Sequence, residues 1–324
     1  MKRGRSPRWL APRRAGGSID LSVDLGPVRL PNPLVAASGT FGHGAEVANL
    51  CDPHEIGAVT VKSVAAFAWT GNPPPRVTEA PGGGMLNSVG LPGPGVDAWI
   101  EHDLPALEAR GARVIASIWG RSAEEYASAA RALKAVDHRL VALEVNLSCP
   151  NLEARGNVFA HSEEATRVAM RAVVESIGES VPTFAKLSPN VTDIVAIARA
   201  ALGAGATGLT LVNSVMGLLV DARTRSPRLG AGGGGLTGAP IKPVALRAVW
   251  EVAREFPGVP IIGTGGVSSG VDAVEMMLAG ATAVGVGTVT FAEPRALLRI
   301  VSEMQAWCAA NGVREVRELI GGLR

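Results

Sequence analysis

Cysteine is scarce in this chain, which has only Cys51, Cys149 and Cys308 among its 324 residues. Their wide spacing forms no metal-binding motif, and three thiols are too few for an iron–sulfur cluster, which normally needs about four ligands. Scattered cysteines of this kind are typical of a reducing compartment, so we expect a cytoplasmic protein with no bound metal. Aromatic residues are also few, at 4% of the chain, so aliphatic side chains must fill its core.

The chain has no strong excess of charge of either sign. Its net charge is +2, but residues 1–18 contain six Lys or Arg residues and no acidic residue, so the remainder carries −4. A body of this charge gives no reason to expect a nucleic-acid-binding face. Residues 1–18 also lack the apolar core of a signal peptide, about 7–15 residues long. We interpret them as a disordered basic leader, although they resemble a transit peptide weakly.

No apolar run predicts a membrane-spanning helix. The uncharged stretch Ala200–Val220 is 21 residues long, which would suffice to cross a bilayer. It contains four glycines together with Thr207, Thr210, Asn213 and Ser214, and this composition favours a loop and a buried strand. We therefore expect no association with a membrane.

The body of the chain alternates apolar segments with alanine-rich segments of helical period. The predicted strands are Pro33–Gly39, Ala58–Val64, Arg113–Gly120, Ala142–Ser148, Thr183–Ser188, Gly208–Ser214, Pro260–Gly266 and Ala283–Thr288. The predicted helices are Ala123–Ala135, Glu163–Ile177, Val191–Ala204, Lys242–Glu255 and Ser269–Ala279. Eight strands mostly alternating with helices indicate an α/β fold, a (β/α)8 TIM barrel, as a single domain over residues 19–324. A doubly wound sheet is the structural alternative.

Three further segments lie outside this alternation. Leu21–Leu25 and Val28–Leu30 flank Gly26-Pro27, which predicts an N-terminal β-hairpin. Ala65–Leu104 and Asn213–Pro240 are long, rich in glycine and follow strand ends. In a barrel such loops lie over the C-terminal face, where these enzymes hold their chemistry. We expect two long irregular loops to form walls of the site.

Polar residues recur at the predicted strand ends. They are Ser38, Lys62, Ser63, Asn146, Cys149, Lys186, Asn213 and Ser214. A lysine at the end of a buried strand is costly unless an anion meets it, although a single one can extend to the surface. Two lysines on separate strands beside several amides indicate a binding site. Cys149 taken alone could equally be a small core residue.

The last two predicted strands end in glycine-rich motifs, at Thr264–Val267 (T-G-G-V) and Gly285–Thr288 (G-V-G-T). Each loop leads toward a predicted helical segment, and glycine lets backbone N–H groups approach an anion there. The loops after strands 7 and 8 commonly bind phosphate in barrels of this type. The alternative is that these glycines only permit tight turns.

Several motifs resemble those of one enzyme family, class 1 dihydroorotate dehydrogenase. They are V-K-S, G-N-P-P-P-R, M-L-N-S-V-G-L, N-L-S-C-P-N, K-L-S-P-N-V-T-D-I, V-N-S-V-M-G, G-L-T-G-A-P-I-K-P and I-I-G-T-G-G-V, from about Ser18 to the C-terminus. Cys149 fits class 1, because the quinone-linked class 2 enzymes have serine there. The motifs K-L-S-P-N-V-T-D-I and A-P-I-K-P most resemble those of the NAD-linked subclass 1B catalytic subunit.

The resemblance implies oxidation of (S)-dihydroorotate to orotate in de novo pyrimidine (UMP) biosynthesis, with FMN as hydride acceptor and Cys149 as general base. It implies that the FMN phosphate binds at Gly265, Gly266, Gly287 and Thr288. It places the rest of the flavin among Ser38, Lys62, Ser63, Ser117, Asn146, Lys186, Val212 and Gly238. It places the substrate against Lys62, Asn87, Ser88, Val89, Gly90, Leu91, Asn146, Asn213 and Ser214. Ser117-Ile118-Trp119 departs from the family pattern, in which Asn-Val-Ala is common. His43 replaces a usual aromatic residue, and we interpret His43 as a packing residue, not a catalytic one.

The resemblance also implies a homodimer and a second subunit, carrying FAD and a 2Fe–2S cluster, that passes electrons to NAD. The chain itself has no G-x-G-x-x-G motif between a strand and a helix of a dinucleotide-binding unit. The alternatives are an FMN-dependent dihydropyrimidine (dihydrouracil) dehydrogenase and a fumarate-linked class 1A enzyme. A sugar-phosphate isomerase or synthase barrel would share only the glycine loops, and a non-catalytic flavin-binding protein would not need Cys149.

Overall fold

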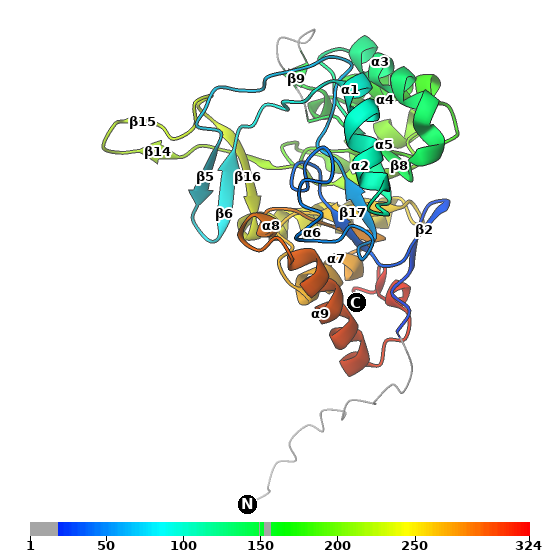
Figure 1. Cartoon of the computed structure of the whole chain (residues 1–324). Helices are drawn as coiled ribbons and strands as arrows, with labels where there is room; N and C mark the ends of the chain where they lie inside the picture. Colours follow the sequence, from blue (N-terminus) through cyan, green and yellow to red (C-terminus); the bar gives the residue numbers. More distant parts are fainter. Residues whose placement is uncertain (1–18, 149, 152–156) are drawn as a thin grey trace, which may run out of the picture.

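The computed structural model describes residues 19–148, 150–151 and 157–324, so Cys149 and the predicted leader lie outside the described residues. Eight parallel strands close into a barrel in which each strand pairs with the next along the chain (Figure 1). They are β3 (Leu34–Ala36), β4 (Ala58–Thr60), β7 (Val114–Ile118), β8 (Ala142–Asn146), β11 (Thr183–Lys186), β12 (Gly208–Leu211), β17 (Ile261–Thr264) and β18 (Ala283–Val286). This barrel confirms the predicted fold and excludes the doubly wound sheet.

The barrel strands are shorter than predicted, mainly at their C-terminal ends. Lys62, for example, lies beyond β4, and its backbone N–H donates to the carbonyl of Gly42 at 2.8 Å. Several polar residues at these ends, such as Lys62, Asn213 and Ser214, therefore lie beyond the ladder and line the site. Alanine, valine, isoleucine and leucine fill the buried core, as the composition predicts.

Helices surround the barrel on the outside. The longer ones are α3 (Ala123–Leu133), α4 (Glu163–Ile177), α5 (Ile194–Gly203), α6 (Lys242–Glu255), α7 (Gly270–Leu278) and α9 (Ala296–Asn311). The shorter ones are α1 (Val96–Ala98), η1 (Trp99–Asp103), α2 (Leu104–Glu108), η2 (Lys134–Arg139), η3 (Phe159–His161), η4 (Ala239–Ile241), α8 (Val289–Ala292) and η5 (Val316–Leu319). The bounds of α4 and α6 match the predicted ranges. Ser122, Ser162, Asp193 and Ser269 each accept a backbone N–H at the start of a helix, which explains where α3, α4, α5 and α7 begin.

Two outer segments complete the description of the barrel repeats, and no helix was predicted in the first of them. The segment between β3 and β4 contains turns and bends but no helix, so the first repeat lacks its helical half. A helical segment was expected after the eighth strand, but the bounds of helix α9 were not predicted. Its buried residues Leu297, Ile300, Met304 and Cys308 recur at helical spacing. It ends before Gly312, whose positive φ of 73° terminates the helix.

The predicted N-terminal hairpin is confirmed as β1 (Val23–Leu25) paired with β2 (Val28–Leu30). Leu25 and Leu30 are fully buried. The turn residue Gly26 packs beside Thr207 and Pro260, which immediately precede β12 and β17 respectively. The hairpin therefore covers the N-terminal end of the barrel and leaves the opposite end open.

The two long glycine-rich segments were predicted to be irregular loops, but this prediction is wrong, because the two segments pair with each other. They form a four-stranded antiparallel sheet in the order β13-β16-β6-β5 (Figure 1). Its strands are β5 (Val77–Ala80), β6 (Gly84–Asn87), β13 (Val215–Gly217) and β16 (Gly234–Gly238). Two short pairs complete the fold: β14 (Val220–Asp221) with β15 (Ser226–Pro227), and β9 (Pro150–Asn151) with β10 (Asn157–Val158). The position of the two segments over the site agrees with the prediction.

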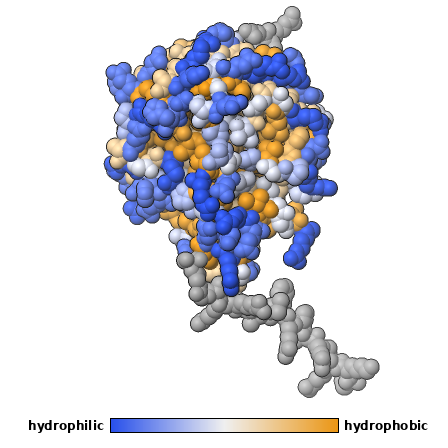
Figure 2. Space-filling model, turned by 90° about the vertical axis from the view of Figure 1, so that its right-hand side faces the viewer, coloured by the Kyte–Doolittle hydropathy of each residue, from blue (hydrophilic) through white to orange (hydrophobic). Residues whose placement is uncertain are grey.

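Figure 2 shows one side of the molecule, on which hydrophilic residues alternate with smaller hydrophobic groups. Within the described residues, every helix is too short or too polar to span a lipid bilayer.

Candidate active site

A cavity of about 480 Å³ opens at the C-terminal ends of the barrel strands, beneath the four-stranded sheet. Most of the predicted site residues line it. These are Ser38, Lys62, Asn87, Ser88, Val89, Gly90, Leu91, Asn146, Lys186, Val212, Asn213, Ser214, Gly238, Gly265, Gly266, Gly287 and Thr288. Ser63 and Ser117 do not line the cavity but are fully buried behind its wall. Cys149 lies outside the described residues.

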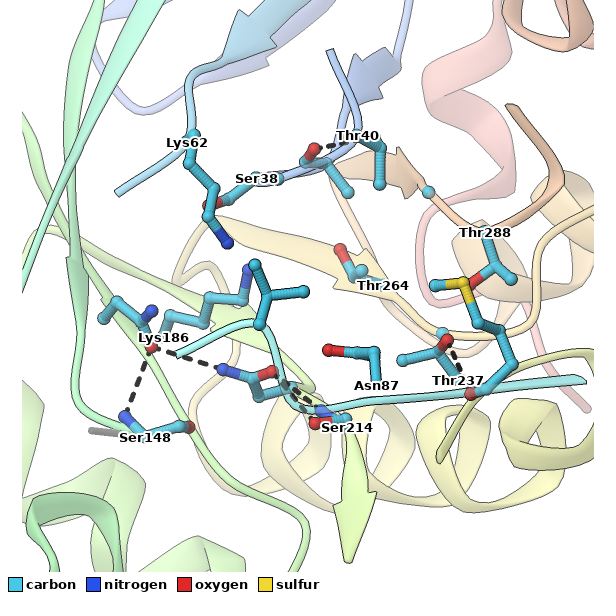
Figure 3. Close-up of a pocket in the computed structure, with 18 of the residues that line it drawn as sticks. Ser38, Thr40, Lys62, Asn87, Ser148, Lys186, Ser214, Thr237, Thr264 and Thr288 are labelled. Carbon is cyan, nitrogen blue, oxygen red and sulfur yellow. Dashed lines mark hydrogen bonds between the residues drawn. The ribbon is translucent and has the colours of Figure 1, made fainter. Parts of the chain in front are cut away.

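Two lysines extend into this cavity from different strands. Lys186 is the last residue of β11 and Lys62 follows β4, and Figure 3 shows both side chains directed into the same space. Lys186 is only 6% exposed. Positive charge at a cavity wall attracts anionic ligands even where a carboxylate of the protein partly compensates it. The arrangement therefore favours an anionic or electron-rich ligand.

A buried carboxylate, which sequence analysis missed, stands behind Lys186. Glu144 lies within β8 and is 2% exposed. Its Oε1 lies 3.5 Å from Lys186 Nζ and accepts a hydrogen bond from Ser117 Oγ at 3.1 Å. The signal was present in the sequence, because a charged residue interrupts the apolar strand V-A-L-E-V-N. The argument that a buried lysine needs a partner applies equally to a buried glutamate.

Asn146, the last residue of β8, is the centre of a hydrogen-bonded cluster. Its Nδ2 donates to Ser63 Oγ at 3.2 Å, and its Oδ1 accepts from Asn213 Nδ2 at 3.2 Å. The backbone carbonyl of Asn146 accepts a hydrogen bond from the buried Tyr126 hydroxyl at 2.6 Å. These contacts hold the amide rigidly at the cavity wall. A rigid amide offers a donor and an acceptor of fixed position to a bound ring.

The glycine loops after β17 and β18 reach the cavity as predicted. Gly266 has a φ of +76°, and a Cβ there would lie 2.5 Å from Lys242 Cβ. Glycine is thus required both for the conformation and for close packing. Gly265, Gly287 and Thr288 complete this part of the wall, so backbone groups and one hydroxyl face the cavity.

The start of α7 contributes less to this site than the sequence suggested. Ser269 accepts from the N–H of Asp272, and Asp272 Oδ2 accepts from the N–H of Ser268 at 2.9 Å. Burial opposes ionisation of Asp272, but hydrogen bonds from Lys242 and Ser268 outweigh burial and hold its pKa at about 2. Because side chains of the protein already satisfy this helix end, an anion at the loops would rely on the loop N–H groups themselves.

An aromatic wall closes another side of the cavity, and sequence analysis did not predict it as a unit. Trp119 packs edge-to-face against Phe67 and Trp69, with ring centroids 5.6 and 6.2 Å away. The Arg121 guanidinium lies 4.2 Å from the Phe67 centroid and pairs with Glu125 at 2.6 Å. Trp69, Trp119 and Arg121 line the cavity. The bulky Trp119 that departs from the family pattern is therefore accommodated by neighbouring aromatic rings.

His43 and Ser148 lie at the edges of the site. His43 does not line the cavity, and its carbonyl accepts the indole N–H of Trp99 at 2.8 Å. Burial lowers the pKa of His43, which agrees with a packing role. Ser148 lines the cavity, and its N–H donates to Asn146 Oδ1 at 3.3 Å.

Comparison with known proteins identifies relatives over almost the whole chain. Residues 20–307 match the family model of dihydroorotate dehydrogenase. The protein named dihydroorotate dehydrogenase B (NAD(+)), catalytic subunit, of Geotalea uraniireducens is 44% identical over 307 residues, which is 95% of this chain and 99% of the relative. Proteins of the same name from Geotalea daltonii and Alkaliphilus metalliredigens are 45% and 43% identical over 94% of this chain, covering 98% and 99% of those relatives.

Proposed function

The chain belongs to the dihydroorotate dehydrogenase family, and on that premise we propose that it oxidises (S)-dihydroorotate to orotate in de novo pyrimidine biosynthesis. The observation that carries this proposal is the single cavity that joins two lysines, the amides of Asn146 and Asn213, and the glycine loops. These groups suit a planar, amide-rich ring with a carboxylate together with a phosphate-bearing cofactor.

The residues present fit FMN, and enzymes of this family use a flavin. The cavity of about 480 Å³ lies within the range of about 300–1,000 Å³ that is common for small-molecule sites. Gly265, Gly266 and Gly287 present backbone rather than side chains to it, which suits a phosphate. When bound, FMN would supply the acceptor for the hydride that leaves C6 of the substrate. Lys186 and Ser38 would contact the ring.

The substrate would be held by the remaining polar residues of the cavity. Asn87 comes from β6 of the four-stranded sheet, and its Nδ2 donates to the carbonyl of Gly235 at 3.1 Å, which leaves its Oδ1 as an acceptor. Asn146 and Asn213 come from the barrel and bond to each other. Lys62 offers a positive charge for the carboxylate. The barrel and the sheet would thus bind the same ring from two sides.

We assign the general base to Cys149, which would take the proton from C5. Among the described residues that line the cavity, none is Asp, Glu, His, Cys or Tyr. Cys149 follows Ser148 in the sequence, and a thiol whose pKa is lowered beside positive charge can act as a base.

The test is an anaerobic mixing experiment with the purified chain. Bound flavin gives a yellow protein, and dihydroorotate should bleach the flavin absorbance whereas dihydrouracil should not. Bleaching by dihydrouracil alone would instead support a dihydropyrimidine dehydrogenase. A colourless protein that binds no added FMN would contradict the proposal.

Electrons would leave through a partner subunit carrying FAD and a 2Fe–2S cluster. Support comes from relatives whose name includes both NAD(+) and catalytic subunit. The homodimer, the cytoplasmic location and the leader at residues 1–18 stay predictions.

A further inference from the structure

Glu144 has no role in the chemistry proposed above, although it is buried and only 2% exposed. It does not line the cavity, whereas its ion-pair partner Lys186 does. Its second partner, Ser117, is also fully buried. A buried carboxylate is expensive to maintain, so its contacts indicate what it stabilises.

Ser117 begins a chain of hydroxyl groups that leads to the cavity. Ser117 Oγ lies 2.9 Å from Ser63 Oγ, which lies 3.3 Å from Ser38 Oγ. Each hydroxyl has one hydrogen, and a carboxylate can only accept. Since Ser117 donates to Glu144, it must accept from Ser63, and Ser63 must then accept from Ser38. The carboxylate therefore sets the direction of every bond in the chain.

A second set of contacts is compatible with this direction. Asn146 Oδ1 accepts from the backbone N–H of Ser148 at 3.3 Å, and a backbone N–H can only donate. The amide orientation is thereby determined, and Asn146 Nδ2 donates to Ser63 Oγ at 3.2 Å. Ser63 accepts here as well, so its single hydrogen remains available for Ser117, where the Glu144 carboxylate requires it. The two ends of the network agree.

The consequence appears at Ser38, which lines the cavity (Figure 3). Its hydrogen points away from the cavity toward Ser63, so its oxygen presents lone pairs to a ligand. We propose that Glu144 is a positioning residue, an inference that rests on the proposed function, in which the cavity holds FMN. It makes Ser38 a hydrogen-bond acceptor for a ring N–H, and it limits the positive charge that Lys186 presents to the ring.

Three variants test this proposal in the full chain. Ser117→Ala breaks the hydroxyl chain and leaves the Glu144–Lys186 pair intact. Glu144→Gln keeps an oxygen acceptor but removes the charge. Thr183→Val removes a buried hydroxyl from the other end of β11, away from the network, and is the matched control.

We expect Ser117→Ala to raise the dissociation constant of oxidised FMN about fivefold, as for the loss of one oriented hydrogen bond. In a Ser38→Ala background the same change should have no further effect, because the chain acts through Ser38. We expect Glu144→Gln to favour reduced over oxidised FMN about tenfold, a potential shift of about +30 mV for a two-electron couple. Thr183→Val should change neither quantity.

Fluorescence quenching of FMN by apoprotein and redox titration with a reference dye give these values. An unchanged affinity in Ser117→Ala, additive effects of Ser117→Ala and Ser38→Ala, or an unchanged potential in Glu144→Gln would overturn the proposal. If Glu144→Gln does not fold, the double-mutant cycle of Ser117→Ala and Ser38→Ala still tests the proposal, through the dissociation constants of FMN. Wild-type protein that binds no FMN would instead contradict the proposed function, so the two failures are distinguishable.

Discussion

Lys242 at the start of α6 reaches Asp272 in the first turn of α7, with its Nζ 2.6 Å from Asp272 Oδ1. The same Nζ lies 2.8 Å from Glu275 Oε2. The backbone of Lys242 also packs against Gly266, where an added Cβ would meet its N and Cα atoms at 2.8 Å. The ion pair thus joins the two helices that flank the glycine loop proposed to bind phosphate.

This ion pair predicts a pH dependence of stability. The folded-state pKa of Asp272 is about 2, below its ordinary value of 3.8. A depressed carboxyl pKa stabilises the fold fully above about pH 4, and the contribution is lost as the pH falls toward 2. Asp272→Asn should therefore cost about 2 kcal/mol of unfolding free energy at pH 7 and almost nothing near pH 2. Urea unfolding of both proteins across this pH range measures it, and an equal difference at both ends would contradict it.

Gly266→Ala should weaken FMN binding because the added Cβ would displace the loop from Lys242. Gly258→Ala is a matched control, since Gly258 has a similar φ of +84° but no atom within 4 Å of an added Cβ. Both changes carry the backbone strain of a positive φ, and only the first alters the cavity. Equal FMN dissociation constants for the two variants would show that the loop does not bind the cofactor.

Cys149→Ser should slow flavin reduction by dihydroorotate by about 10²–10⁴-fold, because a serine hydroxyl is a poor base at neutral pH. FMN binding should be unchanged, since the two side chains are similar in size. Stopped-flow bleaching under anaerobic conditions gives the rate. A variant as fast as wild type would remove Cys149 from the role of base.

Lys186→Ala should lower the flavin reduction potential, because a cation near the ring stabilises its reduced anionic form. It should also destabilise the fold by about 3–5 kcal/mol, since Glu144 is left buried without its charged partner. Lys186→Ala with Glu144→Gln should recover part of that stability but not a wild-type affinity for FMN. Dye-linked redox titration and urea unfolding separate the two effects. An unchanged potential at full flavin occupancy would place Lys186 away from the ring.

The isolated chain should reduce NAD⁺ poorly with dihydroorotate as donor. Co-expression with a partner subunit carrying FAD and a 2Fe–2S cluster should restore the reaction. Parallel assays of NAD⁺ and fumarate reduction by the same preparation test this. Rapid NAD⁺ reduction by the chain alone, or fumarate turnover as fast as flavin reduction, would contradict the need for a partner.

The sequence by itself determined the barrel and most of the cavity lining. Apolar segments such as Ala142–Ser148 alternate with helical segments such as Glu163–Ile177. The spacing of apolar residues within each segment indicates which of its side chains are buried. Once a parallel barrel is inferred, the C-terminal ends of its strands must converge at one face. Lys62, Asn146 and Lys186 could therefore be assigned to one site without knowing any distance between them.

Only the tertiary structure decided which side chains meet within that site. The pairing of β6 with β16 and the chain from Glu144 through Ser117 and Ser63 to Ser38 join residues that are far apart in the sequence. Such contacts depend on the register between strands and on the direction of each side chain. Local periodicity shows that Glu144 and Ser117 are buried, but it cannot show that they are buried against each other, because burial depends on one residue's surroundings and a hydrogen bond depends on the geometry of two.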